Sequence, residues 1–82
     1  MTIRLHTHAK DRIAERGATE EDVRLTVETG ERFAGKYGRS GFRRNFLFNR
    51  EWMGKYYATK QVEAYAVEEQ GWLVITVVVK FF

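Results

Sequence analysis

The stretch WLVITVVVKFF, residues 72–82, decides the fold class of this chain. Its β-branched and aromatic residues favour a strand, and both faces of that strand are apolar over most of its length. Such a strand lies inside a sheet, covered on both sides, or by helices on one side and aromatic residues on the other. Residues 61–68 precede it and are joined to it through Glu69-Gln70-Gly71, so the two segments are predicted to form a β-hairpin.

The segments before this hairpin continue the alternating pattern of a sheet. Residues 42–49 (FRRNFLFN) predict a further strand. Residues 32–37 predict another, followed by a turn over 38–41. Residues 52–58 fit either a strand or a loop, because Gly54 interrupts them. The sheet is therefore expected to have four or five strands.

Two short helices precede the sheet, and each has a capping residue before it and a glycine after it. The first is predicted over about 8–16, between Thr7 and Gly17, and the second over about 20–29, between the capping pair Thr19 and Asp22 and the terminating Gly30. Ala9 and Ile13 give the first helix a thin apolar stripe, as Val23 and Val27 do for the second. We expect a single α+β domain over 1–82, with both helices packed on one face of a mostly antiparallel sheet.

Size and composition restrict the possible functions. The chain has 82 residues, of which 44% are hydrophobic and 30% charged, as in a globular domain. It has no cysteine, which excludes disulfides, thiolate metal sites and a cysteine nucleophile. MTIRLHTHAK has no signal-peptide pattern, and the longest apolar run has 8 residues, against about 20 needed for a membrane span. A cytoplasmic protein without a membrane span is expected.

The middle of the chain is a basic block. Residues 31–60 carry eight basic and two acidic side chains, whereas the whole chain has a net charge of +3. Such blocks favour nucleic acid, because cationic side chains bind phosphates and release counterions. Five cationic residues interleaved with aromatic residues are candidate RNA contacts: Arg43, Arg44, Arg50, Lys55 and Lys60. The alternative is a solvated sheet face whose cations protect exposed edges.

His8, Arg12 and Arg16 recur at every fourth position and would lie roughly in line on a helix. An imidazole in the first helical turn is a suitable general base, because the positive end of the helix disfavours its protonated form. The two guanidinium groups could hold a phosphodiester. The alternative is an exposed row of ion pairs with Asp11 and Glu15, worth roughly 0.3 kcal/mol each.

The run HAKDRIAERGATEEDV, residues 8–23, resembles the N-terminal signature of a family of small bacterial proteins of unknown function. That signature is written H-A-x-x-R-h-x-E-R-G-h-T-x-x-D-V, where h is apolar. The matching residues are His8, Ala9, Arg12, Ile13, Glu15, Arg16, Gly17, Thr19, Asp22 and Val23. Ala18 is smaller than the isoleucine usual at its position. The resemblance covers 16 of the 82 residues.

This family is similar to the BrnT and RelE/ParE toxin superfamily, whose fold places N-terminal helices on a small, strongly bent antiparallel sheet. The resemblance implies an mRNA-cleaving toxin or a derivative of one, with an antitoxin protein as partner. Cleavage in such folds relies on scattered Arg, Lys, His and Tyr residues, and His8, Arg12 and Arg16 are the signature positions that carry over. The C-terminal VVVKFF departs from the arginine-rich end often found in BrnT-like chains.

These observations predict a toxin-like endoribonuclease that acts without a metal or other cofactor at a shallow basic site. His8, Arg12 and Arg16 are its expected catalytic residues, and the five cations of the basic block are its expected RNA contacts. The alternatives are a non-catalytic RNA- or protein-binding module of the same fold, and a toxin that acts on a protein. His6 and His8 have no further ligand at a suitable spacing, so no metal site is expected.

Overall fold

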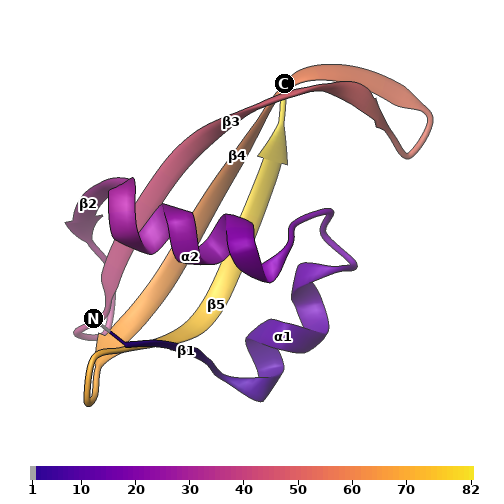
Figure 1. Ribbon diagram of the computed structural model, residues 1–82. Coiled ribbons are helices and arrows are strands. Elements are labelled where there is room, and N and C mark those ends of the chain that lie inside the picture. The colour runs from indigo at the N-terminus through magenta and orange to yellow at the C-terminus, as the bar shows by residue number, and fades with distance from the viewer. Residues whose placement is uncertain (1) are drawn as a thin grey trace.

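The computed structural model describes residues 2–82 as two layers, a five-stranded sheet with two helices on one of its faces (Figure 1). The elements are β1 (Ile3–Leu5), α1 (Thr7–Ile13), α2 (Glu20–Thr29), β2 (Glu31–Ala34), β3 (Ser40–Trp52), β4 (Lys55–Glu68) and β5 (Trp72–Phe81). The strand order is β1-β5-β4-β3-β2, and every pair is antiparallel except β1 with β5. The predicted α+β fold is confirmed.

β5 is an inner strand, as its apolar sequence predicts, with β4 on one side and β1 on the other. Trp72, Val74 and Val77 are at most 5% exposed and face the helices. β1 is absent from the sequence prediction, because three residues are too few for a period of two to stand out. It pairs in parallel with the start of β5, and Ile3 and Leu5 are both buried in the core.

The core lies between the helices and the sheet. The predicted helical stripes, Ala9 with Ile13 and Val23 with Val27, are all buried. They pack over short side chains of the inner strands, namely Val62, Ala64, Ala66, Val74 and Val77. Small residues in β4 let the helices approach the sheet closely, which brings the turn after α1 and the start of α2 within reach of β4 side chains.

The boundaries of α1 differ from the prediction. His6, and not Thr7, caps the helix, because its Nδ1 accepts a hydrogen bond from the backbone N–H of His8 at 3.1 Å. The helix ends at Ile13, three residues earlier than expected. Gly17 has the predicted left-handed conformation, with φ of +82°. The segment between them is therefore a turn, and Arg16 does not belong to the helix.

α2 begins and ends as predicted, at Glu20 and Thr29. Its capping box is complete: Thr19 Oγ1 accepts from the Asp22 backbone N–H and Asp22 Oδ2 accepts from the Thr19 backbone N–H, both at 3.0 Å. β2 covers Glu31–Ala34 and not 32–37, because the chain turns through positive φ after it. These corrections shorten one strand without changing the topology.

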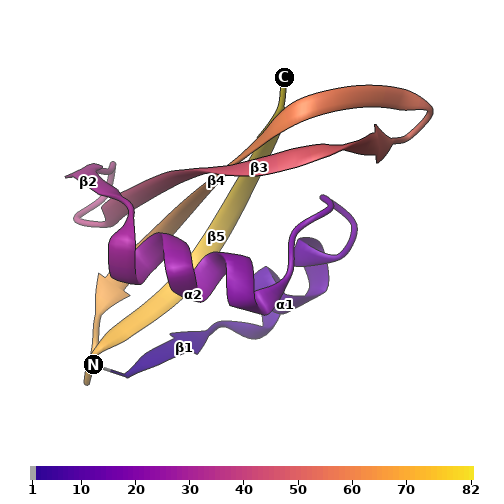
Figure 2. The same cartoon turned by 45° about the horizontal axis from the view of Figure 1, so that its top comes forward.

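The β3–β4 hairpin is longer than predicted and curls beyond the helices (Figures 1 and 2). β3 continues to Trp52, and β4 starts at Lys55, so the ambiguous segment 52–58 is mostly strand. We call residues 47–57 the arm. A bulge between Leu47 and Arg50 interrupts the pairing at its base, where irregular pairing bends a strand.

Candidate functional site

Four of the five predicted RNA contacts lie on the face of the sheet that carries the helices. They lie beside aromatic rings of β3 and β4, and we call this set the cation–aromatic ladder. Arg44 lies 4.7 Å from the ring centroid of Phe46, and Arg50 lies 4.7 Å from that of Phe48. Lys60 lies 6.0 Å from Phe46 and 5.6 Å from Phe48, and Lys55 lies 5.6 Å from Tyr57. These four cations were predicted to form a basic surface with interleaved aromatic residues, and in the structure each lies beside an aromatic ring.

The four cations of the ladder differ in how accessible they are. Arg50 and Lys55 are exposed. Arg44 is half-buried and donates to Thr29 Oγ1 at 2.9 Å, at the end of α2. Lys60 is 6% exposed, so its ammonium group lies inside the protein. Arg50 and Lys55 are therefore the cations of the ladder that a phosphate can reach most easily.

Lys60 has a structural partner on the helix layer. Its Nζ donates to Asp22 Oδ2 at 2.6 Å and to the backbone oxygen of Gly17 at 3.3 Å. The same Asp22 oxygen completes the capping box of α2. A buried ammonium group needs such a partner, because desolvation penalises an isolated charge. Lys60 as an RNA contact stays a prediction, but this ion pair already satisfies its charge.

Aromatic rings from the arm gather on Phe81, near the C-terminal end of β5. Trp52 stacks on Phe81 with ring centroids 5.5 Å apart and 19° between the planes. Tyr57 and Phe48 reach the same ring at 5.4 and 5.1 Å. A Cβ at Gly17 would lie 2.9 Å from Phe81 and 3.1 Å from Trp52, so this cluster rests against the turn after α1. All four rings are half-buried and keep part of their surface in solvent.

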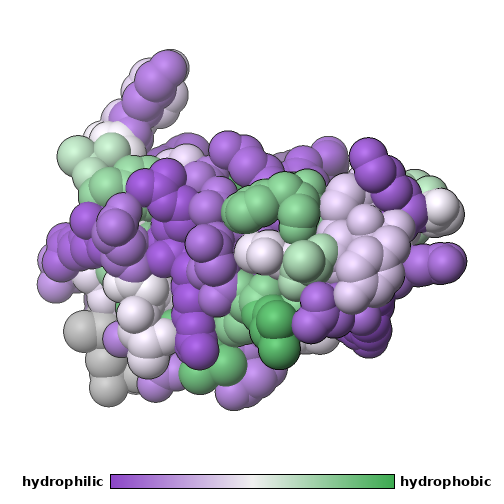
Figure 3. All heavy atoms as spheres, turned by 90° about the horizontal axis from the view of Figure 1, so that it is seen from above, coloured by the Kyte–Doolittle hydropathy of each residue, from purple (hydrophilic) through white to green (hydrophobic). Residues whose placement is uncertain are grey.

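Apolar and charged surface thus lie side by side at this end of the molecule. Seen from above, where the curled hairpin and the C-terminus of Figure 1 are nearest, hydrophobic surface in the middle of the face is bordered by hydrophilic side chains (Figure 3). Register explains part of this arrangement: Arg50 pairs with Tyr57 and Trp52 with Lys55, so cations and rings share one face of the arm.

The three predicted catalytic residues do not form one continuous helical row. His8 and Arg12 are exposed on α1, whereas Arg16 lies in the turn after it and donates to the backbone oxygen of Val77. Among residues 2–82, the side chain of His8 makes no hydrogen bond. No other side chain among residues 2–82 orients this imidazole, and its role as a general base stays a prediction.

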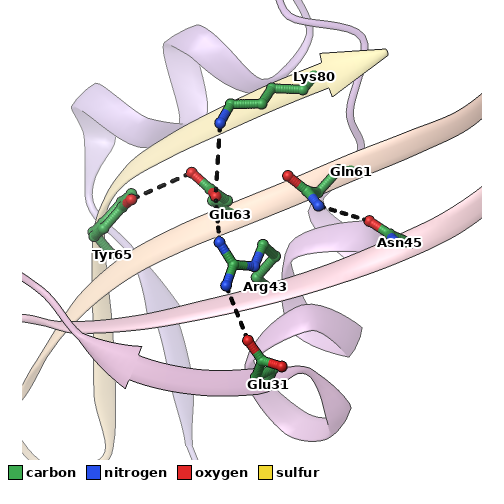
Figure 4. Close-up of polar contacts among 7 residues, drawn as sticks. All are labelled: Glu31, Arg43, Asn45, Gln61, Glu63, Tyr65 and Lys80. Carbon is green, nitrogen blue, oxygen red and sulfur yellow. Dashed lines mark hydrogen bonds and ion pairs between the residues drawn. The ribbon is translucent and has the colours of Figure 1, made fainter. Parts of the chain in front are cut away.

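Arg43, the fifth predicted RNA contact, lies on the opposite face of the sheet, turned away from the helices (Figure 4). It belongs to a closed cycle of side chains that we call the open-face cluster. Its guanidinium donates to Glu63 Oε2 at 3.3 Å and to Glu31 Oε1 at 2.9 Å, and its Cζ lies 4.8 Å from the centroid of Phe33. Phe33 meets Tyr65 edge-on at 5.8 Å, and the Tyr65 hydroxyl donates to Glu63 Oε1 at 3.3 Å.

The carboxylate of Glu63 is the centre of this cluster. It is 6% exposed, although no helix covers this face. Lys80 adds a second cation, with Nζ 4.0 Å from Glu63 Oε2. Gly41 makes room for the cluster, because a Cβ at that position would overlap the ring of Phe33. The face of the sheet without helices therefore has a small packed cluster of its own, with the Glu63 carboxylate at its centre.

The cluster shifts the ionisation of two of its members. Burial raises the pKa of Tyr65 above its ordinary value of about 10, and the nearby Glu63 carboxylate raises this pKa further. The hydrogen bond to Glu31 raises the pKa of Arg43, with Glu63 contributing in the same direction. Tyr65 is therefore kept protonated, and its hydroxyl donates to the Glu63 carboxylate.

The sequence interpretation assigned no site role to Glu63 or Lys80. The sequence did contain a sign of this cluster, since a period of two puts Glu63 and Tyr65 on one face of a strand that is otherwise rich in small apolar residues.

Among residues 2–82, no group of three or more potential ligands could hold a metal ion. No helix in the described part of the chain is long and apolar enough to cross a membrane.

Comparison of the chain with protein-family models, with curated proteins and with solved structures gave no match. Each face of the sheet carries a candidate functional surface. The helix-side face carries the ladder and its exposed cations, and the other face carries the open-face cluster.

Proposed function

We propose that this chain binds single-stranded RNA on the helix-side face of its arm. One observation carries the proposal: the exposed cations Arg50 and Lys55 share a face with the half-buried rings of Trp52 and Tyr57. Single-stranded RNA is recognised by such pairs of groups, because cations attract phosphates and unpaired bases stack on aromatic rings. Paired bases in a duplex offer no free ring face, so the arm selects single strands.

The arrangement sets an expected strength for this interaction. Stacking of a base on an aromatic ring contributes about 1–3 kcal/mol. Two phosphate contacts to a single strand give a slope of about −1.4 for the logarithm of the binding constant against the logarithm of salt concentration. Raising salt from about 50 to 200 mM should therefore weaken binding about sevenfold.

Fluorescence anisotropy with a labelled oligouridylate tests the proposal. The double variant Arg50→Gln/Lys55→Gln should lose most of the binding and most of the salt dependence. The matched control Lys36→Gln/Arg39→Gln removes the same charge from the loop between β2 and β3, and should keep both. Equal losses in the two double variants would show that binding follows net charge and not the arm, which would overturn the proposal.

A second candidate is the toxin-type endoribonuclease that the N-terminal signature implies, acting on RNA in the cytoplasm. The open-face cluster favours it, because a carboxylate, a protonated phenol and two cations meet there. In this reaction the Glu63 carboxylate takes the proton of a ribose 2′-hydroxyl, and the 2′-oxygen bonds to the adjacent phosphorus. The P–O5′ bond breaks, the leaving oxygen takes the proton of Tyr65, and Arg43 and Lys80 stabilise the charged phosphorus centre.

The products are a 2′,3′-cyclic phosphate and a 5′-hydroxyl, and the proton on Glu63 returns to the Tyr65 oxygen along their hydrogen bond. We rank RNA binding above cleavage, because Glu63 is nearly buried whereas Arg50 and Lys55 are exposed. Incubation of RNA with the protein and a chelator tests cleavage. Loss of cutting in Glu63→Gln and Tyr65→Phe would support this centre, whereas loss confined to His8→Ala and Arg12→Ala would assign catalysis to α1.

A further inference from the structure

Large apolar side chains that are exposed to solvent gather at one end of the molecule. In the part of the chain that the structure describes, four of the five lie on the arm or beside it, namely Leu47, Met53, Tyr56 and Phe82. Leu47 is 86% exposed and Phe82 is 59% exposed. The arm extends beyond the helices, so no helix covers these side chains (Figures 1 and 2). Single exposed apolar residues are normal, whereas a group of them on one surface marks an interaction site.

Leu47 and Phe82 lie on the face of the sheet that is turned away from the ladder. In β3, Leu47 stands between Phe46 and Phe48, whose rings belong to the ladder, so its side chain points to the opposite face. It pairs with Thr59, which exchanges two backbone hydrogen bonds with Phe82, at 2.8 and 3.0 Å. Leu47 and Phe82 therefore flank Thr59 on one surface, because residues directly opposite each other share a face.

Two charged residues lie at the two ends of this surface. Towards the tip of the arm, Glu51 pairs with Tyr56, and both alternate with residues of the ladder face. Towards the body, Lys80 precedes Phe82 by two positions and shares its face (Figure 4). Among residues 2–82, Glu51 forms no ion pair, and Lys80 has a single contact, at 4.0 Å, with Glu63. We call this surface the back of the arm, and its side chains are Leu47, Glu51, Tyr56, Lys80 and Phe82.

The back of the arm is complementary to a second copy of itself. Its apolar side chains lie between an anion at one end and a cation at the other. A twofold axis between two copies places Glu51 of each copy opposite Lys80 of the other, and the apolar side chains then pack on one another between these two ion pairs. RNA fits this surface less well than the ladder does, because Glu51 repels phosphates and Leu47 has no ring on which a base can stack.

We infer that two copies of this chain associate through the backs of their arms. The ladder lies on the other face and stays exposed in such a dimer, so this inference is independent of the proposed RNA binding. Five side chains from each copy are few compared with the roughly 20–30 residues a side of a stable interface. We therefore expect a transient dimer, with a dissociation constant of order 0.1 mM.

Sedimentation equilibrium between about 0.01 and 1 mM protein tests the inference, because this range brackets the expected constant. The average mass should rise from that of a monomer towards twice that value. Leu47→Gln should weaken dimerisation at least about fivefold, and it should leave the fold intact because the side chain is exposed. Tyr37→Gln is the matched control, since Tyr37 is equally exposed but lies in the loop between β2 and β3. A monomer at every concentration, or equal weakening by both substitutions, would overturn the inference.

Charge exchange tests the pairing of Glu51 with Lys80 of the other copy. Glu51→Lys places two cations opposite each other at both ends of the dimer, and Lys80→Glu places two anions there, so each protein alone should be monomeric. An equimolar mixture should form a mixed dimer, because every contact again joins a cation and an anion. Absence of the mixed dimer from two folded variants would overturn this pairing.

Circular dichroism first checks that both variants are folded, because Lys80→Glu adds an acidic group near Glu63. Lys80→Gln adds no charge there and provides a second measurement. It should weaken dimerisation about fivefold, since both ends of the dimer lose an ion pair. An unchanged dissociation constant for Lys80→Gln would likewise contradict the pairing.

Discussion

The buried ion pair between Lys60 and Asp22 should be the main polar attachment of the helix layer to the sheet. The side chains are 8% and 16% exposed, and Nζ lies 2.6 Å from Oδ2. Lys60→Met would leave the Asp22 carboxylate with only the backbone N–H of Thr19. Removing one partner of a buried pair costs about 3–5 kcal/mol, and because Asp22 keeps one hydrogen bond and some solvent we expect about 2–3 kcal/mol.

A double-mutant cycle isolates this interaction. Asp22→Asn removes the charge and keeps an oxygen that can cap α2, so it leaves Lys60 as the unpaired partner. The double variant Lys60→Met/Asp22→Asn has no unpaired buried charge, and it should be more stable than the sum of the two single effects predicts by about 2 kcal/mol. For a chain of this size, total stability is roughly 4–12 kcal/mol, so each single variant remains measurable or is visibly unfolded.

Urea unfolding followed by tryptophan fluorescence gives the four stabilities of the cycle. Trp52 reports on the arm and Trp72 on the end where β5 begins, so coincident transitions also check two-state behaviour. Additivity of the two single effects within about 0.5 kcal/mol would refute the reasoning. It would mean that Lys60 does not depend on Asp22 and that its ammonium group is free for another role, such as a phosphate contact.

Three further substitutions probe the turn, the open face and the cap. Gly17→Ala should destabilise the fold by about 2–4 kcal/mol in urea unfolding, because it combines a left-handed backbone with a contact on Phe81. The raised pKa of Tyr65 means that the folded state holds this proton more tightly, so its contribution is full below about pH 10 and is lost as pH rises through the folded pKa. Tyr65→Phe should therefore lose less stability than the wild type between about pH 9 and 11.5 in pH-dependent unfolding, and an equal loss would contradict the shift. Thr19→Ala should cost about 1 kcal/mol by thermal unfolding, and no change would show that the capping box is not a stabilising feature.

The parts of the fold that follow from local chemistry could be predicted from the sequence. The pair Thr19 and Asp22 determines where α2 begins, and the prediction over 20–29 is confirmed. The continuous apolar sequence of β5 correctly indicates an inner strand. The start of α2 is decided by interactions within a few residues, and the inner position of β5 is decided by the exclusion of solvent from both of its faces.

Features that depend on tertiary contacts could not be predicted in this way. β1 exists because Ile3 and Leu5 enter the core beside β5, which three residues cannot signal alone. The arm persists as a strand beyond the residues covered by helices because Trp52 packs on Phe81, a contact 29 positions apart in the chain. Its length is fixed by that distant ring and not by local propensity.

The residues of the candidate site likewise include some that local sequence predicts and some that depend on tertiary contacts. Alternation over residues 42–49 correctly predicts that Arg44 shares a face with Phe46, because face membership follows from a period of two. The place of Arg50 and Lys55 beside aromatic rings does not follow from alternation, because a bulge precedes Arg50 and residues 52–58 fit either a strand or a loop. Alternation also puts Arg43 on the opposite face of the sheet from Arg44. Counting the charges of the basic block does not distinguish these two faces. The buried partner of Lys60 could not be predicted, because Asp22 already has a full local explanation as a cap.

The most direct test of RNA binding by the arm is a titration of the ¹⁵N-labelled chain with a short oligouridylate, read at the two indole N–H signals. Trp52 stacks on Phe81 beside the ladder, whereas Trp72 lies at the opposite end of β5. RNA binding by the arm predicts a saturable shift of the Trp52 signal that weakens about sevenfold from 50 to 200 mM salt, with Trp72 unchanged. A Trp52 signal that stays in place while RNA binds, or a shift confined to Trp72, would contradict it.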